Sequence, residues 1–557
     1  MTATVTLPAP EADPPESGPR PVPAREARLG GLVLAALVVG LIVRVAVGLT
    51  DDAASTDETA YLHSGLAFVQ GDGFERYGQP ELHFPPFLPV LLGVTSWFVT
   101  DPHTGTVALT VVSGTLLIIP LSLLGRRLAG PAGGVTTAWL AALVPGLATM
   151  PQIRGTGSEA EYALLVVTAS WLVVSAADHA GRARRGRVAA AGALVALAYL
   201  TRPEGLLMVV PLGVTVLVLA RRRPPRAATV AAFAVPVLLC VVPYATYLHA
   251  NTGRWELTGK TQDASIEAWA AVARGDRATR NGELYGLDRT GLRFAAEYTP
   301  LTTLAREHPD EYRGIVGTNI SKLRDVVSTR TVLPLPLWLL AAAGAWRFRR
   351  SRTVWLMLAV AALPVLSSLA FFVQQRYLVV TIALATVPMG AALGSLRRSR
   401  VRVAATATVL VVAVSATVVS FRGDVAGWWH PVEQTEQRVA GEWLATHSDP
   451  DARVMTRSMI VEFYAERPSV AMPAAGLDEV LRFARHYGVD YLVADWYTVD
   501  RLMPELGVLL DDGEVPGLRL VHEVRAEGRE ARIFALDPPP PPSSASPPTL
   551  AFTGDGA

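Results

Sequence analysis

The sequence predicts a mainly α-helical, polytopic membrane protein with a small α/β domain near its C-terminal end. Of the 557 residues, 50% are hydrophobic, and the mean hydropathy of +0.32 is high for a soluble enzyme of this length. Up to residue 421, long apolar runs are separated by short arginine-rich segments, as in proteins that cross a bilayer several times. After residue 430, shorter segments with helix and strand periodicity replace this pattern.

Eleven apolar segments are candidates for membrane-spanning helices, each of which needs about 20 residues to cross the hydrocarbon core. They are residues 29–49, 105–125, 134–150, 159–177, 188–201, 203–220, 227–249, 333–346, 353–373, 377–396 and 403–421. The segments 188–201 and 333–346 are shorter than a bilayer requires. The first segment lacks a small-residue cleavage site, so we interpret it as an uncleaved signal anchor.

Arginine-rich connections predict the orientation, because cytoplasmic loops carry an excess of lysine and arginine. With a cytoplasmic N-terminus, all of these connections fall on the cytoplasmic side. They are GRRLAG (125–130), GRARRGR (181–187), RRRPPR (221–226), RFRRSR (347–352) and RRSRVR (397–402). The opposite short connections contain only Arg154, Arg202 and Arg376. Counting residues 85–100 as a span would break this alternation, so we expect them to lie at the outer interface.

The expected organisation has a membrane part followed by an extracytoplasmic part. We predict a disordered cytoplasmic segment (1–28), a transmembrane domain (29–421) with outer loops at 50–104 and 250–332, an extracytoplasmic α/β domain (422–537) and a disordered proline-rich tail (538–557). In the α/β domain we expect helices at 433–447 and 476–488, a short strand in ARVMT, a buried strand in VDYLVAD, and a closing pair in LRLVHEV and ARIFAL. The composition is typical of GC-rich bacterial coding, which suggests the bacterial plasma membrane.

Charged side chains at membrane depth are costly and usually functional, and here they gather at the predicted outer face. The candidates are Arg44, Asp57, Glu58, Arg154, Glu159, Glu161, Arg202, Glu204 and Arg376, with Tyr377 next to the last. Arginines at this depth can bind the phosphate of a lipid donor bidentately. A nearby carboxylate can take the proton of an attacking hydroxyl group. The sequence therefore indicates group transfer from a lipid phosphate.

Structural explanations compete with these functional ones. Asp57 or Thr56 could cap the helix that follows, and Glu58 could interact with the helix dipole. Arg376 could be an interfacial arginine, Arg202 could pair with Glu204, and Arg44 could pair with a buried carboxylate. Glu159 and Glu161 are two residues apart, so at most one of them can face a cavity from a helix.

Several of these segments resemble the bacterial GT-C glycosyltransferases, within them the protein O-mannosyltransferase and lipid A aminoarabinose transferase group. The resemblance rests on TDETAYLHSGLAFVQGDGF (56–74) followed by HFPPFLPVLLG (83–93), and on TRPEG (201–205) and QRYLVV (375–380). It implies that Asp57 is the catalytic base, with Glu58 beside it. It also implies a polyprenyl-phosphate sugar donor, which we expect Arg376, Tyr377, Tyr61, Arg202, Glu159 and His83 to bind.

One position departs from this pattern. Several relatives carry a lysine directly before the Pro-Pro step that contacts the donor phosphate, whereas this chain has Phe84 there and His83 one residue earlier. The resemblance then implies that His83 or one of the arginines replaces the contact.

The leading hypothesis is an inverting glycosyltransferase that moves a monosaccharide, with a hexose such as mannose expected, to an extracytoplasmic protein, cell-wall glycan or glycolipid. A transporter or lipid flippase and a non-catalytic relative are the alternatives, although we find no internal repeat typical of carriers. A net charge of +1 argues against a nucleic-acid partner. The single cysteine, Cys240, excludes an intrachain disulfide. The carboxylates leave room for a divalent cation, but no spacing specifies such a site.

Overall fold

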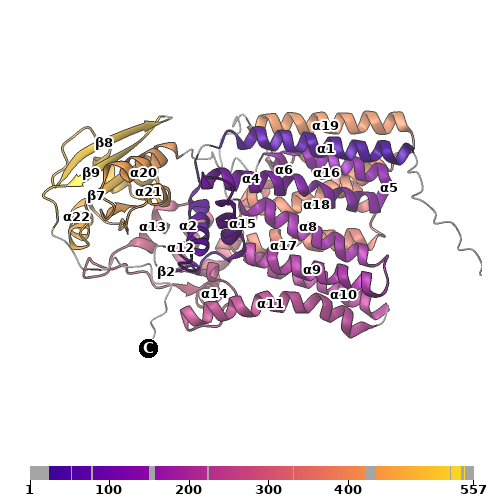
Figure 1. The fold of residues 1–557 in the computed structure, drawn as a ribbon, viewed down its shortest axis with the longest axis horizontal. Helices are drawn as coiled ribbons and strands as arrows, with labels where there is room; N and C mark the ends of the chain where they lie inside the picture. Colours follow the sequence, from indigo (N-terminus) through magenta and orange to yellow (C-terminus); the bar gives the residue numbers. More distant parts are fainter. Residues whose placement is uncertain are drawn as a thin grey trace, which may run out of the picture.

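The computed structural model describes residues 24–51, 53–76, 79–149, 157–222, 225–329, 332–421, 434–526, 528–540 and 545. Arg154, residues 1–23 of the N-terminal segment and most of the proline-rich tail lie outside these ranges. Most of the long helices up to residue 421 lie side by side in a bundle, and a sheet-containing domain sits at one end of it (Figure 1).

The bundle contains a helix for each predicted span. Its members are α1 (Ala24–Gly48), α4 (Pro102–Leu116), α5 (Ile118–Leu143), α8 (Ser158–Ala176), α9 (Gly181–Thr201), α10 (Val209–Arg222), α11 (Arg226–Thr252), α16 (Leu335–Arg347), α17 (Arg352–Ala370), α18 (Val379–Gly394) and α19 (Ser399–Phe421). Helix α1 begins at Ala24 rather than at the predicted residue 29. Within the part of the chain that the structure describes, eight segments are long and apolar enough to cross a membrane. The chain is therefore a multi-pass membrane protein.

One of the eight segments, Pro102–Leu143, holds two predicted spans in 42 residues. The chain reverses at Gly130, whose φ of 69° is easy only for glycine, and Pro131 follows. Across this reversal, the Ser122 hydroxyl donates to the Gly134 carbonyl at 3.1 Å. Helices α9 and α16, which correspond to the two short predicted spans, are not among the eight, since α9 begins with the arginine-rich connection and α16 has only 13 residues.

Helices α5 and α18 pack closely against each other. A Cβ atom at Gly390 would overlap the hydroxyl of Thr137, so only glycine allows this approach. The Thr136 hydroxyl donates to the Gly390 carbonyl at 2.5 Å. Small residues and such interhelical hydrogen bonds hold membrane helices together where lipid removes the hydrophobic driving force.

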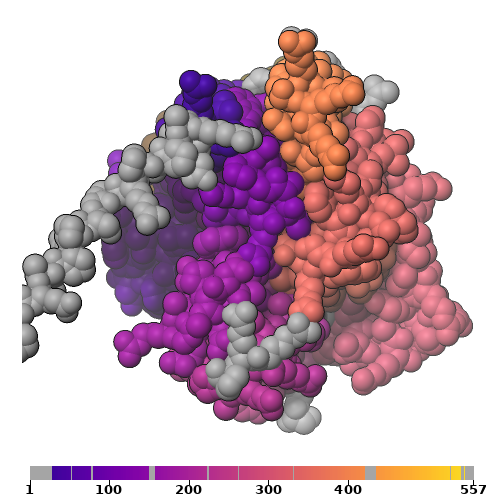
Figure 2. Space-filling view, turned by 90° about the vertical axis from the view of Figure 1, so that its right-hand side faces the viewer, coloured from indigo at the N-terminus to yellow at the C-terminus, as the bar shows by residue number. Residues whose placement is uncertain are grey.

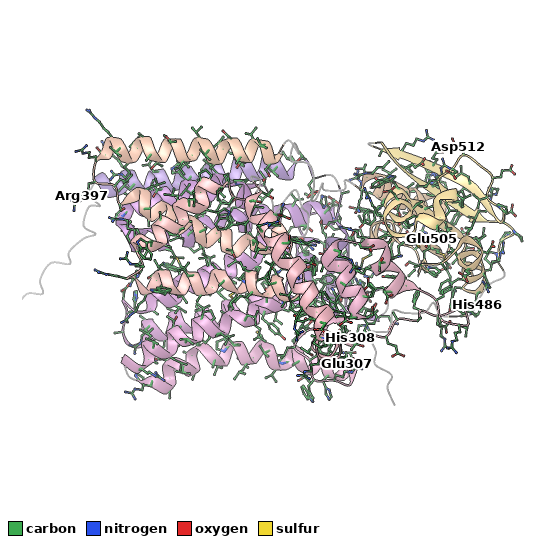
Figure 3. The ribbon with its side chains drawn as sticks, turned by 180° about the vertical axis from the view of Figure 1, so that it is seen from behind. Glu307, His308, Arg397, His486, Glu505 and Asp512 are labelled. Carbon is green, nitrogen blue, oxygen red and sulfur yellow. The ribbon has the colours of Figure 1, made fainter. Side chains whose placement is uncertain are left out.

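The arginine-rich connections lie at the end of the bundle away from the C-terminal domain. Figure 2 looks onto this end, where segments coloured from indigo to orange meet. Arg397 lies there in Figure 3, far from Asp512, Glu505 and His486 of the C-terminal domain. Arg127 pairs with Asp178 of the next connection, and the Arg347 Nε donates to Ser395 Oγ at 3.0 Å. That this end faces the cytoplasm stays a prediction.

The two outer loops lie between the bundle and the C-terminal domain. The first contains α2 (Thr56–Gln70), β1 (Glu75–Arg76), β2 (Gln79–Pro80) and α3 (Phe87–Thr95). The second contains η2 (Gly259–Thr261), β3 (Gln262–Asp263), α12 (Ile266–Arg274), α13 (Arg277–Tyr285), β4 (Thr299–Pro300), α14 (Leu301–Glu307) and α15 (Pro309–Ser328). With nine residues, α3 is too short to cross a bilayer.

The C-terminal domain is a mixed five-stranded sheet in the order β6-β5-β7-β9-β8, with helices on both faces. Its elements are α20 (Thr435–His447), β5 (Val454–Thr456), α21 (Met459–Ala465), β6 (Ser469–Ala471), α22 (Leu477–His486), β7 (Tyr491–Asp495), β8 (Leu518–Ala526) and β9 (Arg529–Leu536). Strand β5 is parallel to β6 and β7, while β9 is antiparallel to β7 and β8. The predicted helices and strands are confirmed, but the short elements β6 and α21 were not predicted.

Candidate active site

Helix α2 presents Asp57 to the bundle because another residue caps the helix. Ser55 is the N-cap: its Oγ accepts from the Glu58 N–H at 3.4 Å, and Glu58 Oε2 accepts from the Ser55 N–H at 3.2 Å. This arrangement is a capping box, and the sequence S-T-D-E at positions 55–58 has its typical S-x-x-E pattern. The alternative explanation that Asp57 or Thr56 caps the helix was therefore wrong, and the Asp57 carboxylate is available for other contacts.

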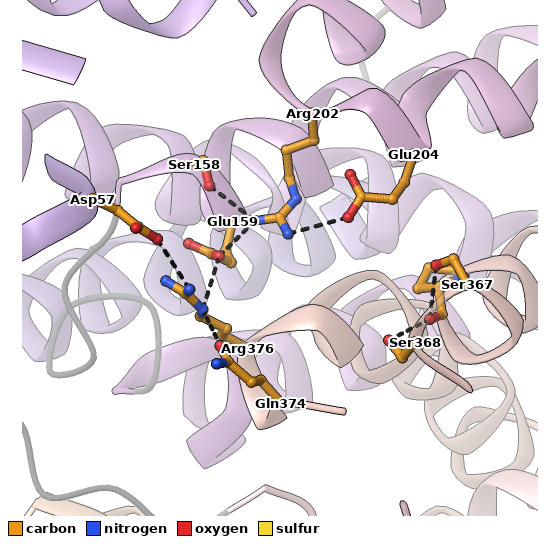
Figure 4. Close-up of polar contacts among 10 residues, drawn as sticks. Asp57, Ser158, Glu159, Arg202, Glu204, Ser367, Ser368, Gln374 and Arg376 are labelled. Carbon is orange, nitrogen blue, oxygen red and sulfur yellow. Dashed lines mark hydrogen bonds and ion pairs between the residues drawn. The ribbon is translucent and has the colours of Figure 1, made fainter. Parts of the chain in front are cut away.

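Asp57 forms an ion pair with an arginine 319 positions later in the chain. Its Oδ2 lies 3.0 Å from Arg376 Nη2, and the two side chains meet in Figure 4. Arg376 belongs to η3 (Gln375–Leu378), which continues directly into α18. Its Nε also donates to Gln374 Oε1 at 2.6 Å and lies 3.9 Å from Glu159 Oε1.

A second arginine completes a row of alternating charges. Arg202 Nη1 donates to Glu159 Oε1 at 2.6 Å and to Ser158 Oγ at 2.9 Å, while its Nη2 lies 3.4 Å from Glu204 Oε1 (Figure 4). The expected Arg202–Glu204 pair exists, but Glu159 is the closer partner. Local sequence could not show this contact, because Arg202 and Glu159 lie on different helices.

The charged row borders a pocket at the end of the bundle that faces the C-terminal domain. The residues that line it are Glu159, Tyr162, Arg202, Glu204, Pro364, Ser367, Arg376, Tyr377 and Val379. The ring of Tyr377 contacts both guanidinium groups, with its centroid 4.8 Å from Arg202 Cζ and 5.3 Å from Arg376 Cζ. Such cation–π contacts fix the direction in which the arginines point.

Four helical segments begin at this pocket. Asp57 and Glu159 lie in the first turns of α2 and α8, and Arg202 and Gln374 are the N-caps of η1 (Pro203–Met208) and η3. Free N–H groups and the positive end of the helix dipole are found at a helix N-terminus, so these starts add a positive potential to that of the arginines.

Two aromatic candidates from the first loop lie beside Asp57. Tyr61 is buried, and its ring contacts that of Phe84 edge to face with centroids 4.5 Å apart. Burial raises the pKa of Tyr61, and the Asp57 charge raises it further. Burial and then the nearby Lys260 charge hold the pKa of His83 well below 6.5. His83 is therefore neutral at pH 7 and cannot supply a positive charge there.

Sequence reasoning did not place Lys260, of η2, among the candidates. Burial raises the pKa of Asp57, but the charges of Arg376 and then Lys260 outweigh this effect and hold the pKa below 3.8. Lys260 thus lies close enough to act on the proposed base. The available signal was weak: Lys260 is one of two lysines in the chain, in a loop about 200 residues from Asp57.

Glu58 points away from the pocket. Its Oε1 lies 2.8 Å from His103 Nδ1, and the other ring nitrogen of His103 lies 3.0 Å from the Asp51 carbonyl oxygen. Both Glu58 and His103 are buried. Glu58 therefore joins the start of α2 to α4, and its place is beside the site rather than in it.

Two further candidates also lie outside the pocket. Arg44 is fully buried and donates to the carbonyls of Gly40, Ala141, Ala142 and Leu147 at 2.9–3.4 Å. The expected carboxylate partner was wrong, because backbone carbonyls near the end of α5 and in α6 (Pro145–Ala148) take its place. Glu161 is buried beside Ser113 and Thr110 of α4, so of the two glutamates only Glu159 reaches the pocket. Among the described residues, no group of three or more histidine, cysteine or acidic side chains could hold a metal ion.

The sequence matches no family model and no curated protein, but solved structures share its fold. ArnT from Cupriavidus metallidurans bound to undecaprenyl phosphate has a TM-score of 0.56 at 15% identity, over 92% of this chain and 98% of that one. The archaeal oligosaccharyltransferase AglB from Archaeoglobus fulgidus, in complex with an inhibitory peptide and a dolichol-phosphate, has a TM-score of 0.56 at 16% identity, over 85% of this chain and 70% of that one.

At these identities the likeness concerns the fold. It extends over most of the chain and includes the C-terminal sheet domain as well as the bundle. The fold predicted from the sequence motifs is confirmed: the chain shares the overall fold of ArnT and AglB.

Proposed function

We propose that this protein transfers a monosaccharide from a polyprenyl-phosphate donor to a hydroxyl group of an extracytoplasmic acceptor. The observation that carries the proposal is the contact of Asp57 with Arg376 at 3.0 Å, beside Arg202, at the outer end of a membrane bundle. A carboxylate and two arginines are the groups that this reaction needs: a base for the acceptor and cations for the leaving phosphate.

The arginines suit the phosphate of a lipid donor. Arg376 and Arg202 are little exposed, with 16% and 9% of their side chains accessible, so their charges are weakly screened. A phosphate between them would receive N–H donors from two planar guanidinium groups, while the lipid tail stays in the bilayer. Solved structures with this fold bound undecaprenyl phosphate and a dolichol-phosphate, which supports a donor of the same class.

The chemical step needs one base. The acceptor oxygen attacks the anomeric carbon of the sugar, and its proton passes to Asp57. The bond between that carbon and the phosphate oxygen breaks, and its electron pair stays on the phosphate, where Arg376 and Arg202 stabilise the added charge. Attack from the side opposite the phosphate inverts the configuration at the anomeric carbon.

Donor binding would also activate the base. In the structure, Arg376 holds Asp57 ionised with a lowered pKa, which makes it a weak proton acceptor. A phosphate that binds Arg376 competes with Asp57 for the same N–H groups. Asp57 then loses part of its stabilisation and its pKa rises, so the base gains strength only when the donor is present.

A hexose such as mannose is the proposed sugar, and a secreted protein, a cell-wall glycan or a glycolipid is the proposed acceptor. Mass spectrometry of lipid-linked sugars in a deletion strain would identify the donor, because a transferase that is missing leaves its donor unused. We expect a polyprenyl-phosphate monosaccharide to accumulate, and the wild-type gene to remove it.

A matched pair of variants makes this test specific. Asp57→Asn should fail to remove the accumulated donor, whereas Asp72→Asn, an exposed carboxylate just after the same helix, should restore the wild-type state. No accumulation in the deletion strain, or full complementation by Asp57→Asn at equal protein level, would overturn the proposal.

A further inference from the structure

A short loop of the second outer segment is fixed against the first outer loop. The Tyr199 hydroxyl donates to the Leu257 carbonyl at 2.6 Å, and Thr258 Oγ1 accepts from the Lys260 N–H at 3.0 Å. The first bond ties the loop to the end of α9, and the second shapes the turn of η2. The backbone that leads into Lys260 is therefore held by two hydrogen bonds.

Glycine at position 259 lets this loop lie directly on residues 82–84. A Cβ atom at Gly259 would overlap the carbonyl oxygen of Leu82. The segment beneath is itself held by the buried Glu81, whose Oε1 accepts from the N–H groups of His83 at 2.7 Å and Phe84 at 3.0 Å. The backbone of residues 82–84 and the backbone of Gly259 thus contact each other directly. This contact fixes the position from which the Lys260 side chain extends.

The contact brings the ammonium group of Lys260 to the Phe84 ring. Nζ lies 4.4 Å from the ring centroid. The charges that act on it most are those of Arg202, Asp57, Glu204 and Arg376. Phe84 has no group that could bind an anion, but its ring supports a cation at the same position.

Within the described part of the chain, the Lys260 ammonium group is not paired with a carboxylate. Among the described residues, none forms an ion pair or a side-chain hydrogen bond with Lys260 Nζ, although Arg202 and Arg376 each pair with carboxylates. Burial and the Arg202 charge lower the pKa of Lys260 to about 8. The surroundings therefore disfavour the charged ammonium form relative to a lysine in water. A half-buried cation that forms no direct ion pair with the described carboxylates can bind an anionic ligand.

We propose that Lys260 is a direct ligand of the donor phosphate, contributed by the second outer loop to the position that Phe84 leaves without a charge. This inference rests on the proposed function and extends it, since it assigns a third phosphate ligand that the sequence motifs do not contain. Lys260 and the two arginines would then surround the phosphate from three different segments of the chain.

The proposal can be tested by transferring the lysine from position 260 to position 84. Lys260→Ala should raise the KM for the donor about tenfold or more, as for the loss of a charged hydrogen bond, with a smaller change in kcat. The double variant Lys260→Ala with Phe84→Lys should recover most of the affinity, because the ammonium returns to the same place from the other loop. Lys322→Ala, which removes the other lysine, should behave as wild type.

A labelling experiment keeps the inference testable if a variant does not fold. The wild-type protein in nanodiscs is acetylated briefly with and without undecaprenyl phosphate, and modification at Lys260 and Lys322 is measured by mass spectrometry. We expect the lipid to protect Lys260 at least about fivefold, through loss of the reactive neutral amine and of access, and to leave Lys322 unchanged.

The outcomes separate the two proposals. If the wild type transfers sugar and binds the lipid, but Lys260 is labelled equally in both samples and Lys260→Ala keeps the wild-type KM, this inference is wrong and the proposed function stands. If the wild type neither binds the lipid in a thermal-shift assay nor transfers sugar, the proposed function fails and the inference fails with it.

Discussion

The two ends of the helix bundle use arginine in opposite ways. At one end, the five arginine-rich segments themselves contain no aspartate or glutamate, and most of their arginines, such as Arg349, Arg397 and Arg398, are exposed, although Arg127 pairs with the neighbouring Asp178 and Arg184 is buried. At the other end, Arg202 and Arg376 are mostly buried and each contacts Glu159 and a second carboxylate. The first arrangement suits solvent and lipid headgroups, and the second suits a ligand.

This difference shows how burial changes what a charged side chain needs from its surroundings. An exposed arginine is hydrated and needs no partner, so its position can shift with little effect. A buried arginine needs partners on the protein, and those partners fix its geometry. The helix starts around the pocket add to the difference, since they bring N–H groups to an end that already holds two guanidinium groups.

Removal of the proposed base should give the largest effect. Asp57→Asn keeps the shape of the side chain but cannot take a proton, so kcat should fall about 10²–10⁴-fold. Release of polyprenyl phosphate by purified protein measures this directly. Asp72→Asn is the matched control and should stay within about twofold of wild type. Equal rates for the two variants would remove Asp57 from the mechanism.

Replacement of one arginine at each end of the bundle should give opposite results. Arg376→Gln should lower kcat/KM for the donor about 10²–10³-fold, because it removes a preorganised donor to the developing phosphate charge. Arg398→Gln at the opposite end should leave kcat/KM unchanged. Arg376→Lys should have a kcat/KM only slightly above that of Arg376→Gln, since an ammonium group cannot bind phosphate bidentately. A fully active Arg376→Gln variant would contradict the assigned role.

The pH dependence should show a falling limb near pH 8. Lys260 is charged below its lowered pKa of about 8 and neutral above it, so kcat/KM should fall about tenfold per pH unit above 8, toward a lower plateau. The groups facing Lys260 are Asp57, Glu204, Arg202, Arg376 and His83, of which the carboxylates and arginines keep their charges and His83 stays neutral in this range. In Lys260→Arg the fall of kcat/KM should move to higher pH, and in Lys322→Ala it should stay near pH 8. An unchanged limb in Lys260→Arg would assign it to another group.

Loss of the cap of α2 should give the smallest effect. Ser55→Ala removes the N-cap hydrogen bond at the start of the helix that carries Asp57, at a cost of about 1 kcal/mol. We expect a slightly lower midpoint in thermal unfolding and a kcat reduced only a few-fold, since Asp57 stays in place. Thr56→Ala, which alters no cap, should leave both values unchanged. A loss in Thr56→Ala as large as in Ser55→Ala would contradict the capping assignment.

The bundle could be predicted from the sequence because apolar length and arginine placement act locally. Asp57 and Arg376 could be predicted as candidate site residues, because each is a charged residue next to a predicted membrane span. Their contact at 3.0 Å could not be predicted without the motif resemblance, because it joins residues 319 positions apart. The four carbonyl partners of Arg44 were hidden because backbone acceptors have no sequence signature.

Lys260 shows most clearly what sequence reasoning lacked. The chain has phenylalanine before the Pro-Pro step, and nothing near that position indicates that another segment supplies the cation. The signal consists of Gly259 against Leu82 and of Lys260 Nζ over the Phe84 ring. Both contacts are tertiary, so they become visible only when the two outer loops are folded together.

An experimental structure of the protein with bound undecaprenyl phosphate is the most direct test of the whole account. We predict that the phosphate lies between Arg376 and Arg202, within hydrogen-bond distance of Lys260 Nζ, and that the ion pair between Asp57 and Arg376 has opened. A phosphate bound at the opposite end of the bundle, or an unchanged pair of Asp57 and Arg376 with the phosphate elsewhere, would contradict it.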